Sequence, residues 1–163
     1  MNGLEICAMH DDDLDKCVQA IRSAFGTVAK EFGLTEATCP TNAAFMKSER
    51  LTYDRDNGNL MYVLKERGKV AGFMQLEMKE ADRYELKNIC VIPEYRHLGF
   101  GEALLDFAKG KVKELGGNKI SIGVIEENTV LKQWYSNNGF IHLGTKKFDH
   151  LPFTVGFMET VIE

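Results

Sequence analysis

The chain has 163 residues, of which 44% are hydrophobic and 27% are charged, and its formal net charge at pH 7 is -4. This length predicts one globular domain, residues 1–163, whose core needs neither disulfides nor metal. The acidic balance gives no electrostatic reason to expect a nucleic-acid partner, and no apolar run approaches the ~20 residues of a membrane helix.

The cysteines favour a reducing compartment. Cys7, Cys17, Cys39 and Cys90 form neither a CxxC pair nor a metal-ligand spacing. This pattern favours free thiols over disulfides or a structural zinc site. The first nine residues carry Glu5 and no basic start, so no secretory leader is expected. We therefore expect a cytoplasmic protein without a metal.

The N-terminal segment reads as a strand followed by a helix. Apolar or small residues at every second position of 4–8 are typical of a strand that ends near His10. Three acids at 11–13 precede apolar residues at helical spacing over 14–28. Acids beside a histidine can suggest a metal site, but at this position they favour a helix start, where they cap the helix and complement its dipole.

A long loop and a hairpin follow. Residues 33–43 lack periodicity and predict a loop, either functional or a plain connector, before a short helix over about 44–55. Residues 60–64 and 70–78 read as two strands joined through the turn at 66–69.

The stretch from Tyr84 to Leu105 combines a strand, a break, a glycine-spaced turn and a helix. Residues 89–92 are strand-prone, and Pro93 has no N–H for a sheet ladder, so pairing is expected to stop or splay there. A helix is predicted from Gly99 onward. The amides of Arg96–Gly101 then lie at a helix N-terminus, which is a place that binds phosphate.

The last third completes the sheet. Residues 120–124 alternate as a strand, and because a helical crossover leads to them, they should lie parallel to the strand at 86–92. Asn128 is placed to cap the next helix, and two closing strands are predicted at 140–143 and 153–162.

These motifs together resemble the GNAT-type N-acetyltransferase superfamily. Arg96–Gly101, Arg-His-Leu-Gly-Phe-Gly, fits the Q/R-x-x-G-x-G/A signature between a strand and a helix. Residues 88–95 precede it, and Asn128 with the segment 134–140 resembles the second cofactor segment of that family. The clear match covers residues 84–144. A dinucleotide-binding fold is disfavoured, because antiparallel strands precede the glycine turn and G-x-G-x-x-G is absent.

The resemblance implies an α/β (α+β) fold: a mixed, mostly antiparallel central sheet of about seven strands with flanking helices and a parallel, splayed strand pair. It implies that acetyl-CoA lies in the splay, with no metal. The implied cofactor-binding residues are Ile89, Cys90 and Val91 for pantetheine, Arg96, His97, Leu98, Gly99, Phe100 and Gly101 for pyrophosphate, and Asn128.

The resemblance also implies direct acetyl transfer. Tyr135 matches the general-acid position and Glu85 a position at which some members carry a catalytic base, although many members use a water chain. Cys90 is then a buried spectator, and the Val91 amide is the expected donor to the acetyl carbonyl. Core packing for Tyr135 and a surface position for Glu85 are the alternatives.

The implied function is acetylation of a primary amine on a small molecule or a peptide, and a non-catalytic acyl-CoA-binding module is the alternative. The acceptor is expected near residues 25–45, Glu77 and 145–157, and His150 is a candidate contact. His142 has no assigned role. A homodimer is expected only by analogy with relatives.

Overall fold

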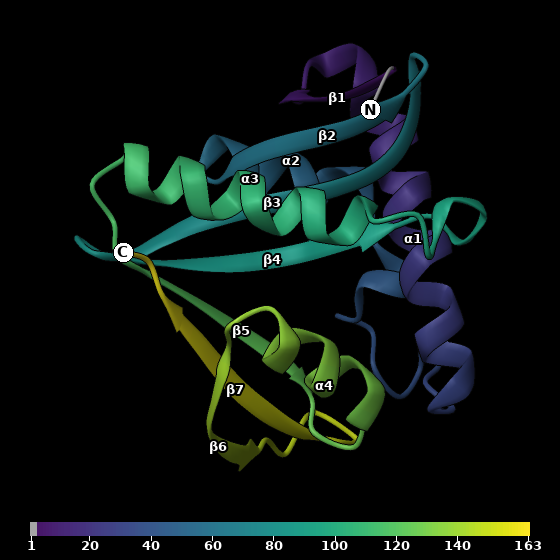
Figure 1. Cartoon of the computed structure of the whole chain (residues 1–163). Helices are drawn as coiled ribbons and strands as arrows, with labels where there is room; N and C mark the ends of the chain where they lie inside the picture. The colour runs from purple at the N-terminus through teal and green to yellow at the C-terminus, as the bar shows by residue number, and fades with distance from the viewer. Residues whose placement is uncertain (1–2) are drawn as a thin grey trace.

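The computed structural model describes residues 3–163, which build one seven-stranded sheet with the order β1-β2-β3-β4-β5-β7-β6 (Figure 1). The strands are β1 (Leu4–Ala8), β2 (Leu60–Glu66), β3 (Lys69–Glu80), β4 (Arg83–Val91), β5 (Lys119–Ile125), β6 (Ile141–Lys147) and β7 (Thr154–Val161). The helices are α1 (Leu14–Glu31), α2 (Ser48–Asp56), α3 (Phe100–Glu114) and α4 (Thr129–Asn137), with 3-10 turns η1 (Asp11–Asp13), η2 (Ala43–Phe45) and η3 (Pro93–Tyr95). All strand pairs are antiparallel except β4–β5. The predicted fold class is thereby confirmed.

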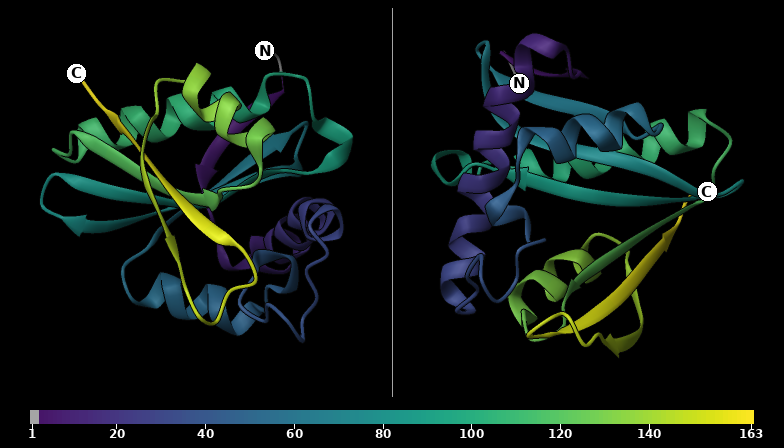
Figure 2. Two further views of the ribbon diagram at one scale, coloured as in Figure 1. Left: turned by 90° about the horizontal axis from the view of Figure 1, so that it is seen from below. Right: turned by 180° about the vertical axis from the view of Figure 1, so that it is seen from behind.

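Helices cover both faces of the sheet. One face packs on α3 and α4 around the wholly buried Leu104 and Ile120. The opposite face packs on α1 and α2 around Ile21, Leu51 and Phe73, and Figure 2 shows these two helices on the far side from α3. No helix among residues 3–163 is long and apolar enough to cross a membrane.

A β-bulge interrupts β4. Phe73 lies opposite Cys90 and Gln75 lies opposite Lys87, so Met74 of β3 faces two residues of β4, Asn88 and Ile89. Asn88 has the left-handed φ of 55° that such an extra residue can adopt.

The bulge reverses which side chains of β4 face which core. Before it, Tyr84 and Leu86 face the α3 core. After it, Cys90 faces the α1 core, and Ile89 and Val91 pack toward α3. A one-residue insertion in a period-2 strand produces this reversal.

The parallel pair β4–β5 parts early. The two strands pair only over Arg83–Glu85 and Lys119–Ser121, and beyond them they diverge as the two arms of a V (Figure 1). The prediction that the strands splay at Pro93 was therefore wrong: they part after Glu85. The cause lies inside the strand, because a bulge bends the strand that carries it.

Two predicted details near the N-terminus are also corrected. The helix predicted over 44–55 is two elements, because Met46 is extended (φ -53°, ψ 138°) and ends the 3-10 turn η2 before α2 begins. Asp13 precedes α1 but makes no side-chain cap to it; its carboxylate instead accepts from the His10 amide and pairs with Lys65 at 3.1 Å.

Replacing glycine by alanine should have opposite effects on the free energy of unfolding at two positions. A Cβ at Gly72 would lie 2.6 Å from the Cys90 carbonyl oxygen, whereas a Cβ at Gly26 in α1 meets nothing within 4 Å. Gly72→Ala should destabilise the fold by about 1–3 kcal/mol because β3 and β4 must separate. Gly26→Ala should stabilise it by about 0.5–1 kcal/mol. Urea unfolding measures both, and an unchanged midpoint for Gly72→Ala would contradict the close approach of the strands.

Candidate active site

The start of α3 offers main-chain amides to an anion. Gly99 is the N-cap residue with a φ of 84° and no side-chain cap, and its carbonyl accepts from the Ala103 amide. The amides of 100–102 therefore have no carbonyl within the helix to bond, and they carry the positive end of the helix dipole. His97 also has a left-handed φ, 65°, and residues 97–99 are exposed. This geometry fits a phosphate group.

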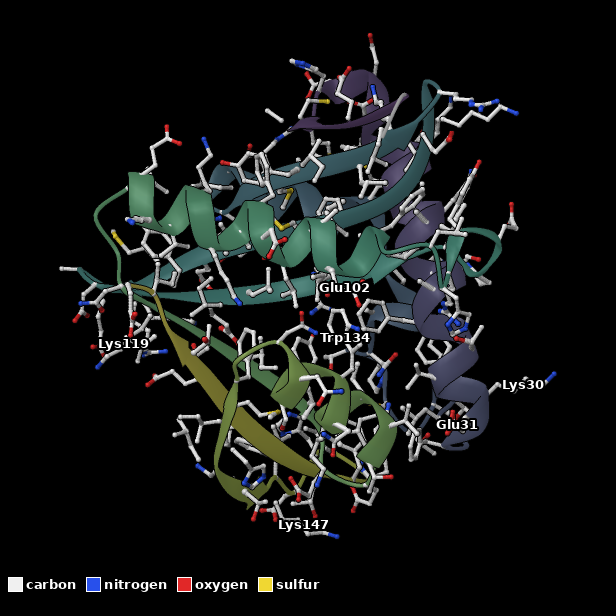
Figure 3. The ribbon with its side chains drawn as sticks, in the orientation of Figure 1. Lys30, Glu31, Glu102, Lys119, Trp134 and Lys147 are labelled. Atoms are coloured by element: carbon white, nitrogen blue, oxygen red, sulfur yellow. The ribbon has the colours of Figure 1, made fainter. Side chains whose placement is uncertain are left out.

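The two glycines of the signature are required for different reasons. Gly99 needs its positive φ, whereas a Cβ at Gly101 would lie 2.9 Å from Cζ2 of Trp134. Trp134 reaches from α4, and its indole N–H donates to Glu102 Oε1 at 3.2 Å, so the side chains meet between α3 and α4 (Figure 3). The sequence did not predict this bridge.

The main chain of β4 presents groups toward the parting of the strands, which is the region where β4 and β5 diverge beyond Glu85 and Ser121. The Ile92 amide donates to Ala71 of β3, and the Cys90 carbonyl also points at β3, close to Gly72. Because main-chain groups alternate along an antiparallel strand, those of Ile89 and Val91 point to the opposite side. Of the three residues predicted to offer main-chain groups to pantetheine, Cys90 therefore directs its own to β3.

Arg96 ties the loop to its surroundings. Its Nη2 donates to the carbonyl of Ala24 in α1 at 2.9 Å, and its Nε donates to the carbonyl of Val91 at 3.4 Å. The guanidinium thus binds main-chain oxygens of α1 and β4, where the sequence had suggested a charge for pyrophosphate. These charge-assisted bonds hold the loop ahead of α3 in place.

Tyr135 lies in the core on the α3 face of the sheet. Its side chain is 4% exposed, and its ring makes edge contacts with Trp134 and Phe140 at centroid distances of 5.0 and 5.2 Å. Burial raises the pKa of the phenol well above its usual range, so the hydroxyl keeps its proton. Asn128 caps the helix that carries Tyr135 by accepting from the Leu131 amide at 3.1 Å, as predicted.

Glu85 is the last residue of β4 paired with β5, on the face opposite the α3 core. Its carboxylate is 3.3 Å from Lys79 Nζ, which also binds Glu77 at 3.0 Å, and Lys87 binds Glu77 at 3.3 Å. Burial alone would raise the pKa of Glu77, but the two lysines outweigh it and lower that pKa. Tyr135 and Glu85 thus lie on opposite faces of the sheet, and Glu85 marks the point where β4 and β5 separate.

The two loops without a motif pack on each other. An apolar cluster joins Leu34, Cys39 and Ala44 before α2 to Leu151 and Phe153 before β7. The loops predicted to border the acceptor therefore meet on the α1 side of the parting.

Two histidines outside the signature have identified neighbours. His150 is exposed with its ring 5.7 Å from Phe148, and His142 Nε2 lies 2.8 Å from Glu126 Oε1. Among residues 3–163, no three His, Cys, Asp or Glu side chains are grouped to hold a metal ion.

The sequence missed Gln75 and Asn88, which hydrogen-bond to each other at the bulge. One signal was present: asparagine has a low preference for strands and tolerates the left-handed conformation, so an asparagine inside a strand-prone run can mark a bulge.

The chain is similar to known proteins in both sequence and structure. The model of the acetyltransferase (GNAT) family matches residues 29–140. An N-acetyltransferase in the pepI 3′ region of Lactobacillus delbrueckii subsp. lactis is 26% identical over 161 residues, 91% of this chain and 90% of the relative.

Two solved structures show the same fold. The PaiA N-acetyltransferase from Thermoplasma acidophilum, in complex with coenzyme A, has a TM-score of 0.82 at 21% identity, with 97% of this chain and 98% of the other covered. The ribosomal-protein-S18-alanine N-acetyltransferase from Escherichia coli has a TM-score of 0.78 at 18% identity, with 98% and 94% covered.

Thiol reactivity tests the burial of Cys90. Burial raises the pKa of Cys90 and that of Cys17 to about 12, so at pH 8 about one thiol in 10⁴ is ionised. Iodoacetamide should therefore modify the half-buried Cys7 first in the folded protein, and all four cysteines in urea. Mass spectrometry of the modified peptides measures this; alkylation of Cys90 as fast as Cys7 would contradict its assignment as an inert core thiol.

Proposed function

Because the chain belongs to the acetyltransferase (GNAT) family, we propose that it transfers the acetyl group of acetyl-CoA to a primary amine of a small molecule or a peptide. The observation that carries the proposal is the uncapped start of α3 beside the parted strands β4 and β5. A phosphate site and an open strand edge in one place suit a ligand that has both a pyrophosphate and an amide-containing arm.

The described residues fit acetyl-CoA as co-substrate. The amides of 100–102 and the left-handed backbone at His97 and Gly99 form the pyrophosphate site. Ile89 and Val91 offer main-chain groups to the pantetheine amides, as an exposed sheet edge does to a peptide. Asn128, the N-cap residue of α4, is a further candidate contact to the co-substrate.

Acetyl-CoA supplies an activated acetyl thioester. In the transfer a bond forms between the amine nitrogen and the acetyl carbon, and the bond from that carbon to sulfur breaks. The amine loses a proton and the CoA thiolate gains one. Glu85 takes the proton from the amine, the protonated Tyr135 gives one to the sulfur, and the Val91 amide polarises the carbonyl.

The acceptor is proposed to enter from the α1 side of the parting. Glu77 and Glu85 supply carboxylates on that face, and one lysine ammonium, that of Lys79, already lies within 3.0 and 3.3 Å of them. A substrate amine has the same chemistry as this ammonium. The cytoplasm is the proposed compartment, in keeping with the four free thiols.

The direct test is acetyl-CoA turnover against polyamines, aminoglycosides, amino acids and peptides with free N-termini, measured as CoA release. Acetylation of at least one class is expected. Binding of acetyl-CoA without CoA release for any amine would overturn the proposal in favour of an acyl-CoA-binding module.

Tyr135→Phe tests the general acid. Loss of the hydroxyl should lower kcat by about 10²-fold or more, while the affinity for acetyl-CoA stays close to that of the native chain. Since burial raises the pKa of Tyr135, its ionisation should cause no alkaline loss of native kcat below about pH 10. Tyr62→Phe, another buried tyrosine, on β2, is the matched control. Equal kcat for Tyr135→Phe and native protein at every pH would reject this role.

Glu85→Gln tests the base. The variant keeps the shape of the side chain but cannot accept a proton, so kcat near neutral pH should fall by about 10²-fold. Glu80→Gln removes a carboxylate that, among residues 3–163, pairs only with Arg83 at the end of the same hairpin, and it should keep native kcat. Measurement of kcat from about pH 6 to pH 9 compares them; the same profile for Glu85→Gln and native protein would assign proton removal to water.

A further inference from the structure

A buried side-chain amide holds the bulge of β4. Asn88 is the bulge residue with a φ of 55°, and its Nδ2 donates to Gln75 Oε1 at 2.7 Å. A residue with a Cβ resists this left-handed conformation, so it persists where neighbouring groups hold it.

Gln75 is in turn held on its other side. Its Nε2 donates to Asn59 Oδ1 at 2.9 Å and to Asp54 Oδ2 at 3.1 Å. Gln75 is wholly buried and Asn59 is nearly so, and each hydrogen atom of the Gln75 amide has its own acceptor. Asp54, Asn59, Gln75 and Asn88 thus form a hydrogen-bonded relay. The relay runs from α2 and the turn before β2, through β3, to the bulge.

The bulge lies between the two functions of β4. On its N-terminal side Glu85 is the last residue paired with β5, and on its C-terminal side Ile89 and Val91 turn their main-chain groups to the parting. Without the extra residue the alternation along β4 would shift by one, and these groups would point at β3. The edge proposed to bind pantetheine therefore depends on the conformation of Asn88.

We propose that Gln75, Asn59 and Asp54 are positioning residues for acetyl transfer, which hold Asn88 in its left-handed conformation and so direct the Ile89 and Val91 main chain at the co-substrate. This inference rests on the proposed function. The three residues touch neither acetyl group nor amine; they act through the backbone of β4. A relay that served stability alone would leave the affinity for CoA unchanged when it was removed.

The first experiment compares alanine and glycine at position 88. Both changes remove the hydrogen bond, but glycine adopts a positive φ without a Cβ and alanine does not. Asn88→Ala should therefore weaken the binding of CoA by about 5- to 30-fold, and Asn88→Gly by clearly less. Isothermal titration calorimetry with CoA measures both, and Asn88 is only partly buried, so both variants should fold.

Arg67 provides the matched control. It has a φ of 51° in the β2–β3 hairpin, remote from the parting, and its side chain is mostly exposed. Arg67→Ala and Arg67→Gly impose the same backbone change, so they should shift only the unfolding temperature. A loss of CoA affinity in Arg67→Ala equal to that in Asn88→Ala would overturn the proposal, since backbone strain at any left-handed residue would then be enough to weaken CoA binding.

The second experiment is rescue. Gln75→Leu should weaken CoA binding and lower kcat, and adding Asn88→Gly should restore part of both, because glycine no longer needs the Gln75 carbonyl. If Gln75→Leu does not fold, Asp54→Ala on the half-buried face of α2 takes its place in the same pair. Native CoA affinity in the Gln75 or Asp54 variant, or no restoration in the double variant, would overturn the positioning role.

Calorimetry separates the two proposals because it needs no acceptor. CoA binding by the native chain without acetyl transfer to any amine overturns the proposed function, and the Asn88 and Gln75 comparisons still decide the relay. Acetyl transfer with unchanged CoA affinity across the variants overturns the relay alone.

Discussion

Strand β4 pairs with both β3 and β5 at its start but with β3 alone at its end. The rest of the candidate site depends on this loss of one neighbour. The parallel pairing to β5 stops at Glu85. Beyond it, β5 no longer pairs with β4, and the Val91 carbonyl accepts from Arg96 instead. Main-chain groups that a sheet leaves unpaired require another partner, and a ligand with amide groups can supply one. The uncapped start of α3 adds free main-chain amides after the same strand.

The proposed acid and base belong to opposite faces of the sheet. Tyr135 lies in the α3 core and Glu85 on the charged face next to α1, so the two side chains need not compete for one position. Their surroundings differ: burial keeps the phenol of Tyr135 protonated by raising its pKa, whereas the Glu85 carboxylate lies 3.3 Å from Lys79 Nζ. The burial that packs the Tyr135 ring into the core is also what raises the pKa of its hydroxyl.

Much of this could be predicted from local patterns in the chain. The order of elements, the helix start at Gly99 and the cap at Asn128 all follow from apolar spacing and from the backbone preferences of glycine and asparagine. The exceptions are informative. Pro93 looked like the point of separation, but the strands part earlier because an extra residue at Asn88 bends β4, and a bulge leaves no period of its own in a nine-residue strand.

By itself, then, the sequence determined the fold class, the glycine turn at the start of α3 and the residues that resemble an acetyl-CoA site, because each of these depends on neighbours within a few positions along the chain. Only the tertiary structure decided the direction of the β4 main chain, the bonding of Arg96 to α1 and the contact of Trp134 with Glu102. Those features join residues from elements far apart in the sequence, and hydrogen bonds and close packing between such elements follow from how they meet in space, which no local pattern encodes.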